Sequence, residues 1–181
     1  MSNFPIFITI GGQGSRLKCI SPKDKQFLYW KDKRIIDWLL ELFPGAKLLG
    51  NKKTNNRYET LLEISNLQNA LIIDCDIIPF DINLNFNLKE DCVWCFESNK
   101  NKWGSVLIEN NKLSEASENG NISNIKLSGA YYIANVPYFL DKMKNNNKNS
   151  IASSLTNCNI ILENTFKRFG DVEDYYNALN I

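Results

Sequence analysis

The stretch that decides the fold is Phe4-Pro5-Ile6-Phe7-Ile8-Thr9-Ile10-Gly11-Gly12-Gln13-Gly14-Ser15-Arg16-Leu17. Its first half is a short run of β-branched and aromatic residues, which is typical of a buried strand. Its second half is rich in glycine, which lets the backbone turn sharply and lets amide groups approach a phosphate closely. Arg16 adds a forked donor with a permanent positive charge. We therefore expect a strand that ends in a phosphate-binding loop made of Gly11, Gly12, Gln13, Gly14 and Ser15.

The loop is not one of the common glycine motifs. No Gly-Lys-Ser/Thr follows it, as the Walker pattern requires, and its spacing differs from the Rossmann G-x-G-x-x-G. A tight strand-to-helix turn without a ligand is the alternative that this segment alone leaves open. Lys23 and Lys25 follow in a polar stretch, where a lysine either turns back toward the same phosphates or remains a solvated charge.

The rest of the chain alternates between strand and helix patterns in its first half and is rich in strands in its second half. Apolar runs predict strands at 46–49, 70–73, 92–97, 104–109, 113–116, 129–134 and 160–162. Helical spacing predicts helices at 35–43, 57–66, 136–143 and 172–179, with Asp171 as the cap of the last one. This order favours an α/β fold with a single Rossmann-like domain over 1–181. We expect a mixed, mostly parallel central sheet flanked by helices, with a small antiparallel annex.

Two carboxylates follow the strand expected at 70–73, in the sequence Asp74-Cys75-Asp76. In open α/β sheets ligands bind outside the carboxyl ends of the strands, which is where these residues and the glycine loop both fall. Alternation along an extended backbone places Asp74 and Asp76 on the same side. Carboxylate oxygens next to a phosphate loop suit a hard cation such as Mg²⁺. The alternative is that one Asp caps a turn while the other is solvated.

Composition excludes several classes of function. The 181 residues contain no histidine, which removes Ser-His-Asp and Cys-His catalysis and most zinc enzymes. The net charge of +1 gives no overall field for nucleic acid or an anionic membrane. No apolar run is long enough to span a bilayer, and the first ten residues lack the pattern of a signal peptide. The five cysteines include one Cys92-Val-Trp-Cys95 pair in an apolar run, so we expect reduced structural thiols and a cytoplasmic protein.

Taken together, these motifs resemble the sugar-phosphate nucleotidyltransferases of the GT-A-like α/β class. Residues 11–17 are similar to that family's loop GGxGTRL, with Ser15 in place of threonine. Residues 24–28 and 31–37 fall at the interval of its Pro-Lys-x-Leu and Gly-Lys-Pro-Ile-Ile-Asp segments. Residues 71–76 resemble the strand that ends in its metal-binding Asp. Further similar segments are Trp103-Gly104-Ser105-Val106, Ser128-Gly129-Ala130-Tyr131-Tyr132-Ile133 and the closing segment 170–178.

The resemblance implies roles for individual residues. It implies that the glycine loop and Arg16 hold the β- and γ-phosphates of a nucleoside triphosphate and that Lys25 stabilises the charge on the α-phosphate. It implies Mg²⁺ held by Asp76 and Asp171, with Asp74 as a further ligand or an outer-shell partner. Contacts to the second substrate fall on Glu118 and Gly129.

Three departures from the family pattern stand out. Asn119 replaces a lysine that accompanies Glu118 in the family. Without a gap the second metal-binding Asp of the sugar enzymes falls at Arg168, whereas in the choline-phosphate cytidylyltransferase-like branch it falls at or next to Asp171, which we favour. The stretch 49–69 is short and lacks the usual base-binding glycines, which leaves only residues 57–60 in that place.

The function that follows is transfer of a nucleotide, with CTP favoured, to a small phosphorylated sugar or alcohol, as in sugar-nucleotide synthesis for capsule or another cell-surface polysaccharide. Three alternatives remain open from the sequence. They are a molybdopterin guanylyltransferase-like enzyme, a GT-A glycosyltransferase that uses Asp74-x-Asp76, and a non-catalytic relative that only binds nucleotide. Neither nucleic acid nor a membrane is an expected partner, and the sequence does not indicate an oligomeric state.

Overall fold

The computed structural model of the chain describes residues 4–10, 15–21, 24–50, 54, 56–118, 121–145, 150–163 and 165–180. Gly11, Gly12, Gln13 and Gly14 of the expected phosphate loop lie outside the described residues. Ser15 begins the short 3-10 helix η1 (Ser15–Leu17), directly after that loop.

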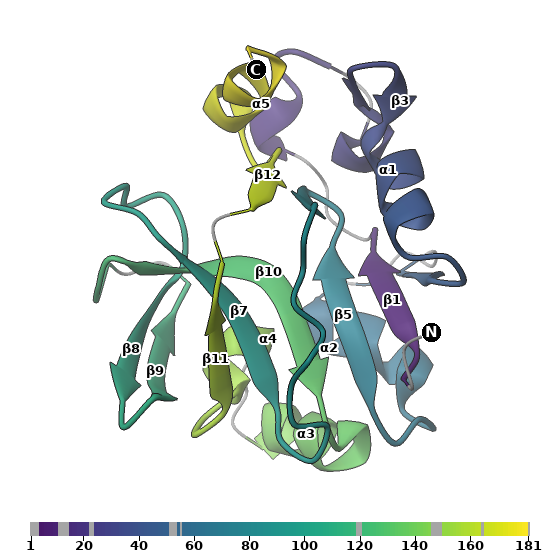
Figure 1. Cartoon of the computed structure of the whole chain (residues 1–181). Helices are drawn as coiled ribbons and strands as arrows, with labels where there is room; N and C mark the ends of the chain where they lie inside the picture. The colour runs from purple at the N-terminus through teal and green to yellow at the C-terminus, as the bar shows by residue number, and fades with distance from the viewer. Residues whose placement is uncertain are drawn as a thin grey trace.

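Within the described residues one sheet of eight strands forms the centre of the molecule (Figure 1). Its strand order is β4-β1-β5-β10-β7-β11-β9-β8. The bounds in that order are Lys47–Leu49, Ile6–Thr9, Ala70–Asp74, Ile125–Ile133, Cys92–Glu97, Asn159–Leu162, Lys112–Ser117 and Ser105–Glu109.

The sheet is mixed, as the sequence predicts. Strands β4, β1 and β5 are parallel, and β7 and β11 are parallel. Strand β10 runs antiparallel to both β5 and β7, so it joins the two parallel blocks. The expected antiparallel annex is the β8–β9 hairpin, whose turn residues Asn110 and Asn111 both have positive φ, as a tight hairpin turn requires. This hairpin continues the main sheet at its edge.

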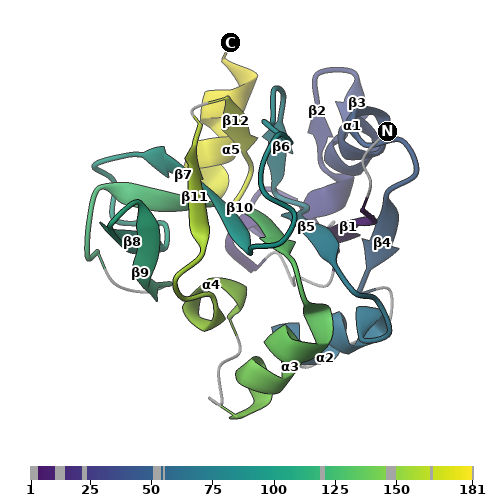
Figure 2. The same cartoon turned by 60° about the horizontal axis from the view of Figure 1, so that its bottom comes forward.

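Helices cover both faces of the sheet (Figures 1 and 2). One face carries α2 (Arg57–Leu61), α3 (Val136–Asn145) and α4 (Ile151–Ser154). The other face carries α1 (Ile35–Leu42) and α5 (Val172–Leu179). The strands alternate between these layers, since Ile72 packs toward α2 and α3 while Ile73 packs toward α1. Burial on both faces explains why the strands are continuous apolar runs in the sequence.

Helix boundaries follow local signals that the sequence carries. Helix α1 ends before Pro44-Gly45, where Gly45 takes a φ of 86°. Asn56 caps α2 by accepting a hydrogen bond from the Glu59 amide, and the short 3-10 helix η3 (Leu62–Ile64) continues it. Asp171 caps α5 in the expected way, by accepting from the amide of Asp174.

Several short elements have no clear pattern in the sequence. They are the 3-10 helix η2 (Lys25–Phe27), the hairpin of β2 (Tyr29–Trp30) with β3 (Lys33–Arg34), and the pairing of β6 (Ile77–Pro79) with β12 (Phe166–Arg168). Two hydrogen bonds fix α5 on the hairpin: Trp30 Nε1 donates to Ala178 O, and the Tyr175 hydroxyl donates to Tyr29 O, both at 2.8 Å. Pairs this far apart in the sequence arise only from tertiary packing.

Two further expectations concern the cysteines and the membrane. All five cysteines are free, and burial raises the pKa of Cys75, Cys92 and Cys158 to about 12, which makes them unreactive structural thiols. Among the described helices, none combines the length and the hydropathy that crossing a bilayer demands.

Candidate active site

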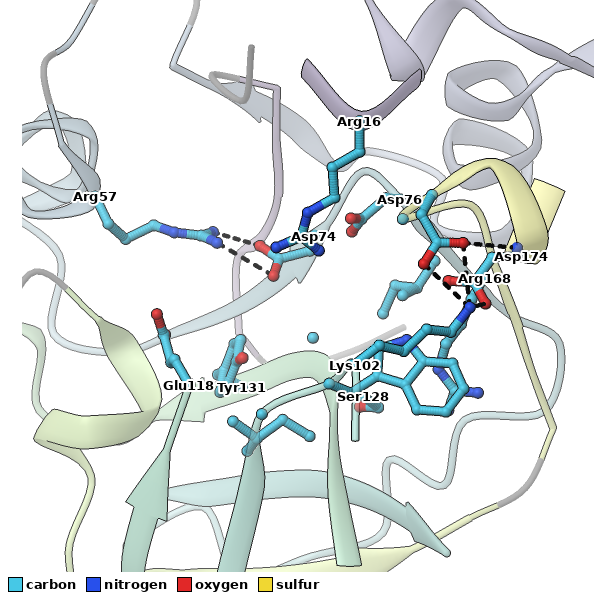
Figure 3. Close-up of a pocket in the computed structure, with 17 residues that line it drawn as sticks. Arg16, Arg57, Asp74, Asp76, Lys102, Glu118, Ser128, Tyr131, Arg168 and Asp174 are labelled. Carbon is cyan, nitrogen blue, oxygen red and sulfur yellow. Dashed lines mark hydrogen bonds and ion pairs between the residues drawn. The ribbon is translucent and has the colours of Figure 1, made fainter. Parts of the chain in front are cut away.

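A polar cavity of about 260 Å³ opens at the carboxyl ends of β1 and β5 (Figure 3). It lies where the sheet position of the glycine loop and of Asp74-Cys75-Asp76 predicts a ligand. The charged side chains that line it come from seven different segments: Arg16, Arg57, Asp74, Asp76, Lys102, Glu118, Arg168, Asp171 and Asp174.

The two residues that the sequence singles out for phosphate and metal chemistry meet directly. Lys25, at the start of η2, donates from its Nζ to Oδ2 of Asp76 at 2.6 Å, across 51 residues of sequence. Both side chains are about four-fifths buried. Burial opposes the charge of Lys25, but Asp76 outweighs it and holds the pKa of the lysine above its ordinary value. The lysine is therefore a fixed cation beside the strand end.

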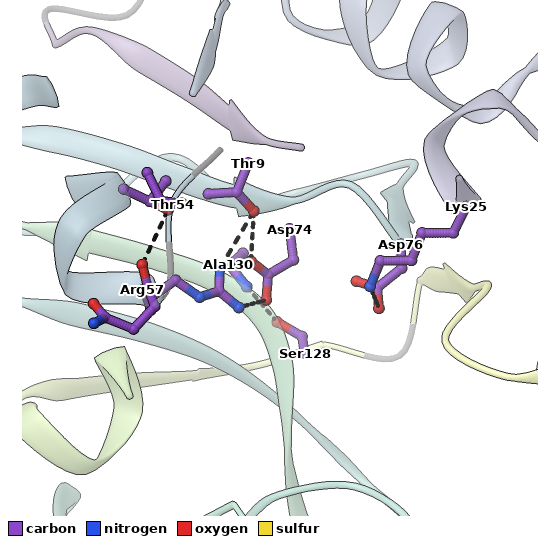
Figure 4. A network of polar contacts seen from close by, with 10 residues as sticks. Thr9, Lys25, Thr54, Arg57, Asp74, Asp76, Ser128 and Ala130 are labelled. Carbon is purple, nitrogen blue, oxygen red and sulfur yellow. Dashed lines mark hydrogen bonds and ion pairs between the residues drawn. The ribbon is translucent and has the colours of Figure 1, made fainter. Parts of the chain in front are cut away.

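Asp74 has a different set of partners from Asp76, although only one residue separates them (Figure 4). The hydroxyl of Thr9 donates to its Oδ1 at 2.8 Å, and the two terminal nitrogens of Arg57 bond to its two oxygens, with Nη2 to Oδ2 at 3.3 Å. Burial of the Asp74 carboxyl opposes its ionisation, yet Arg57 holds its pKa below the ordinary value. Asp74 thus ties β1, β5 and the start of α2 together, and its role as a metal ligand stays a prediction.

Gly129 lies against this ion pair. Strand β10 changes register between Leu127 and Tyr131, and Gly129 has a φ of 96° there. A Cβ at this position would stand 3.2 Å from both Cβ and Oδ2 of Asp74. The left-handed backbone and the close approach both require glycine. Gly129 lines the cavity, where its predicted contact with the second substrate remains untested.

Lys102 closes the side of the cavity next to α5 (Figure 3). It lies in the turn before β8, and its Nζ is 2.6 Å from Oδ1 of Asp174 and 3.1 Å from Asp171 and from Glu173. Burial works against the charge of Lys102, but these carboxylates raise its pKa above the ordinary value. The one lysine therefore ties the turn at 98–104 to the first turn of α5.

Of the three carboxylates around Lys102, Asp174 is the one with an oxygen that accepts no hydrogen bond of normal geometry from the described residues. This oxygen, Oδ2, is buried, although the Trp103 side chain is close enough to favour the charged form of Asp174. Burial raises the pKa of Asp174 above its ordinary value. A Cβ added at Gly170 would stand 3.4 Å from this oxygen and 3.6 Å from Oδ2 of Asp76, so both oxygens border the same space.

The remaining predicted residues divide into two groups. Arg16 and Glu118 both line the cavity and enter it from opposite sides in Figure 3. The loop glycines and Gln13 lie outside the described residues, so the structure does not test their phosphate contacts.

Three charged lining residues have no site role in the motif reasoning: Lys102, Arg168 and Asp174. Lys102 lies outside any motif, and the sequence marks Asp174 only as a helix-start residue. Arg168 attracts attention only because it replaces an expected carboxylate. Arg57 stands in a stretch noted for the nucleotide base, but its observed partner is Asp74. These contacts depend on how loops fold over the sheet, which the spacing of residues does not encode.

At the level of sequence, neither a family model nor a curated protein matches the chain. Solved structures do match over nearly its whole length. The CTP:phosphocholine cytidylyltransferase of Streptococcus pneumoniae superposes with a TM-score of 0.76 at 14% identity, covering 98% of each chain. The nucleoside-diphosphate-sugar pyrophosphorylase of Vibrio cholerae RC9 gives 0.74 at 14% identity, covering 97% of this chain and 100% of its own. A UDP-glucose pyrophosphorylase complexed with UDP-glucose gives 0.72 at 16% identity, covering 98% of this chain and 97% of its own. The chain therefore has the fold of these nucleotidyltransferases, which confirms the predicted GT-A-like fold class.

Proposed function

We propose that the protein is a nucleotidyltransferase that joins a nucleoside triphosphate to a small phosphorylated sugar or alcohol and releases pyrophosphate. The observation that carries the proposal is the 2.6 Å contact of Lys25 with Asp76 beside the cavity. The family resemblance of the sequence implies that these two residues serve the α-phosphate and the metal. Their meeting at the carboxyl ends of β1 and β5, in a fold that known nucleotidyltransferases share, supports the same chemistry here.

The chain's own residues account for most of the reaction. The nucleophile is a phosphate oxygen that is already an anion, so the absence of histidine costs nothing. Arg16 and the preceding loop hold the β- and γ-phosphates, and Lys25 neutralises the charge that grows on the α-phosphate during in-line attack. Catalysis then consists of holding the two anions in line and offsetting their repulsion.

The carboxylates fit a magnesium ion of the kind that substrate phosphates help to hold. No group of three or more acidic or cysteine side chains within the described residues is arranged to enclose a metal ion. Mg²⁺ commonly needs only one or two protein carboxylates, with waters and phosphates completing its shell. Asp76 and Asp174 meet that need, because an oxygen of each borders the space beside Gly170. Asp171, favoured from the sequence, lies alongside as the cap of α5. When bound, the ion would supply charge neutralisation at the phosphates.

The nucleotide that we favour is CTP. The similar fold of a CTP:phosphocholine cytidylyltransferase supports it, although a UDP-glucose pyrophosphorylase is similar to almost the same degree. The stretch 49–69 is short and lacks the glycines that usually contact the base in this family, so it does not select a nucleotide. The preference for CTP therefore rests on the resemblance.

The test is pyrophosphate release from each of the four nucleoside triphosphates with a panel of hexose 1-phosphates, phosphocholine and glycerol 3-phosphate. We expect release with one nucleotide and one class of acceptor, and loss of release when EDTA removes divalent cations. Tight nucleotide binding with no release across the panel would favour a non-catalytic nucleotide-binding protein instead.

A further inference from the structure

Among the described residues, four cationic side chains line the cavity, and they fall into two groups of two. Arg57 and Lys102 are engaged by carboxylates, namely Asp74 for the first and the start of α5 for the second. Arg16 and Arg168 form no ion pair with any described residue, although both border the same cavity. A reaction between two anionic substrates is favoured by a cation near each substrate, and an arginine without an ion pair is available for that role. The proposed function already gives Arg16 to the triphosphate, which leaves Arg168.

The guanidinium of Arg168 is half-buried and has no ion-pair partner among the described residues. The side chain leaves β12 with its guanidinium carbon 3.1 Å from the centre of the Phe96 ring and 5.1 Å from that of Trp103. Its Nε atom is buried and has no hydrogen-bond partner among the described residues. Burial lowers the pKa of Arg168 to about 10, so the group remains charged at neutral pH.

The carboxylates near Arg168 do not form an ion pair that would offset the energetic cost of burying its guanidinium. Asp174 and Asp76 favour its charged form from a distance, but neither makes an ion pair with it, since Asp174 is bound to Lys102 and Asp76 to Lys25. A buried polar group without a partner costs about 1–3 kcal/mol, and a charged group costs more. Folding tolerates such an arrangement where a ligand supplies the missing partner.

We propose that Arg168 binds the phosphate of the second substrate, between Trp103 and Asp174 in the cavity. This inference rests on the proposed function and specifies the substrate class at its unassigned end. A guanidinium presents parallel donors that match two oxygens of a phosphate monoester. The rings of Phe96 and Trp103 hold the guanidinium of Arg168 in one orientation, as a bidentate contact with phosphate requires.

The same two rings argue against a cationic acceptor. The faces of Phe96 and Trp103 that could surround a quaternary amine are already covered by Arg168, and Nζ of Lys102 lies 4.9 Å from the Trp103 ring. A trimethylammonium group would meet two fixed positive charges there. These two rings are therefore unavailable as a cage for a quaternary amine, which favours a sugar phosphate or a neutral alcohol phosphate as the acceptor.

The experiment measures binding of inorganic phosphate by titration calorimetry to protein saturated with inorganic tripolyphosphate, at constant ionic strength. Tripolyphosphate occupies the Arg16 end, so the added phosphate reports on the other end. We expect Arg168→Gln to weaken phosphate binding about tenfold or more. We expect Arg168→Lys, which keeps the charge but loses the fork, to weaken it less. Lys167→Gln, with the same charge change on the same strand, should leave it within about twofold.

The outcomes separate this inference from the function on which it rests. Arg16→Gln should show the opposite pattern, with weaker tripolyphosphate binding and normal phosphate binding. Wild-type protein that binds neither anion contradicts the proposed function itself. Normal binding of both anions, with phosphate affinity unchanged in both Arg168 variants, overturns the role of Arg168 alone. If Arg168→Gln does not fold, the phosphate affinity of Arg168→Lys tests the inference in its place. A second test adds choline to the wild-type protein with phosphate bound. Displacement of phosphate by choline would contradict the inference.

Discussion

At one end of the cavity Lys25 meets Asp76 as a single pair, whereas at the other end Lys102 is shared by three carboxylates of α5. The first arrangement leaves a lysine that a substrate phosphate can take over, because only one bond must be given up. The second arrangement holds the turn at 98–104 against α5, because losing one contact leaves two. The comparison teaches that ion pairs of the same length, 2.6 Å, differ in how many partners hold them, which fits the chemical role that we propose for Lys25 and a structural role for Lys102.

The largest effect is expected at Lys25. Replacing it with alanine removes the charge beside the α-phosphate, and loss of one such electrostatic contact costs about 10²–10³ in turnover. The protein should still fold, although leaving Asp76 without its partner should cost some stability, because both side chains are about four-fifths buried. Steady-state pyrophosphate release and thermal unfolding measure the two effects. Lys33→Ala, which breaks the exposed pair with Glu41, is the control and should change neither. Normal turnover in Lys25→Ala would remove this lysine from the chemistry.

The next largest effect is expected at Gly129, which packs against the Asp74 carboxylate and tests the structural role of that contact. Gly129→Ala should lower the free energy of unfolding by about 3 kcal/mol, because the new Cβ adds a clash with Asp74 to the strain of a positive φ. Gly45→Ala is a matched control, since Gly45 has a φ of 86° but nothing within 4 Å of its added Cβ, and about 1 kcal/mol is expected. Urea denaturation gives both values. If both variants lose the same free energy of unfolding, the contact between the added Cβ and Asp74 has no energetic cost.

Arg57 tests whether the pair with Asp74 is architectural. Removing one partner of a fully buried pair costs about 3–5 kcal/mol. Since the Arg57 side chain is 34% exposed, we expect about 2 kcal/mol for Arg57→Met at pH 7, with little change in phosphate binding at the Arg168 end. The pKa of Asp74 is held below its ordinary value, so the pair stabilises the protein above about pH 4 and the benefit disappears as pH falls through the folded-state pKa. Denaturation of wild type and variant at pH 7 and in acid should therefore show the gap closing, and a gap independent of pH would contradict the assignment.

The smallest effect is expected from Lys102. Lys102→Met leaves Asp174 buried without its counter-ion, and about 1–2 kcal/mol of stability should be lost. The neighbouring Lys100→Met breaks only the exposed pair with Glu173 and should cost less than about 0.5 kcal/mol. Hydrogen exchange at the α5 amides locates the loss in the first variant. Equal protection of α5 in both variants would mean that the three-way contact does not hold the turn in place.

The same contrast explains what sequence reasoning finds and what it misses. The position of Asp76 at the cavity is predictable because it follows an apolar strand by two residues, and Asp171 as a helix cap is predictable because Asp174 follows at the right interval. The partner of Asp74 is not predictable, since Arg57 reaches it from a helix on the other side of a turn. Lys102 and Arg168 are found only in the folded chain, where β12 and the turn at 98–104 meet over the sheet. Strand ends are fixed by local pattern, whereas loop-to-loop contacts depend on the whole topology.

The position of β12 and α5 in the chain has a consequence for biosynthesis. All eight strands of the central sheet are complete once translation has passed β11, at residue 162. Arg168, Asp171 and Asp174 emerge from the ribosome only afterwards, and α5 then docks on the β2–β3 hairpin through Trp30 and Tyr175. A nascent chain therefore contains every strand of the sheet before it contains the last residues that line the cavity. A premature stop just after β11 would leave a chain with all eight strands but without Arg168, the residue that we propose for the second substrate.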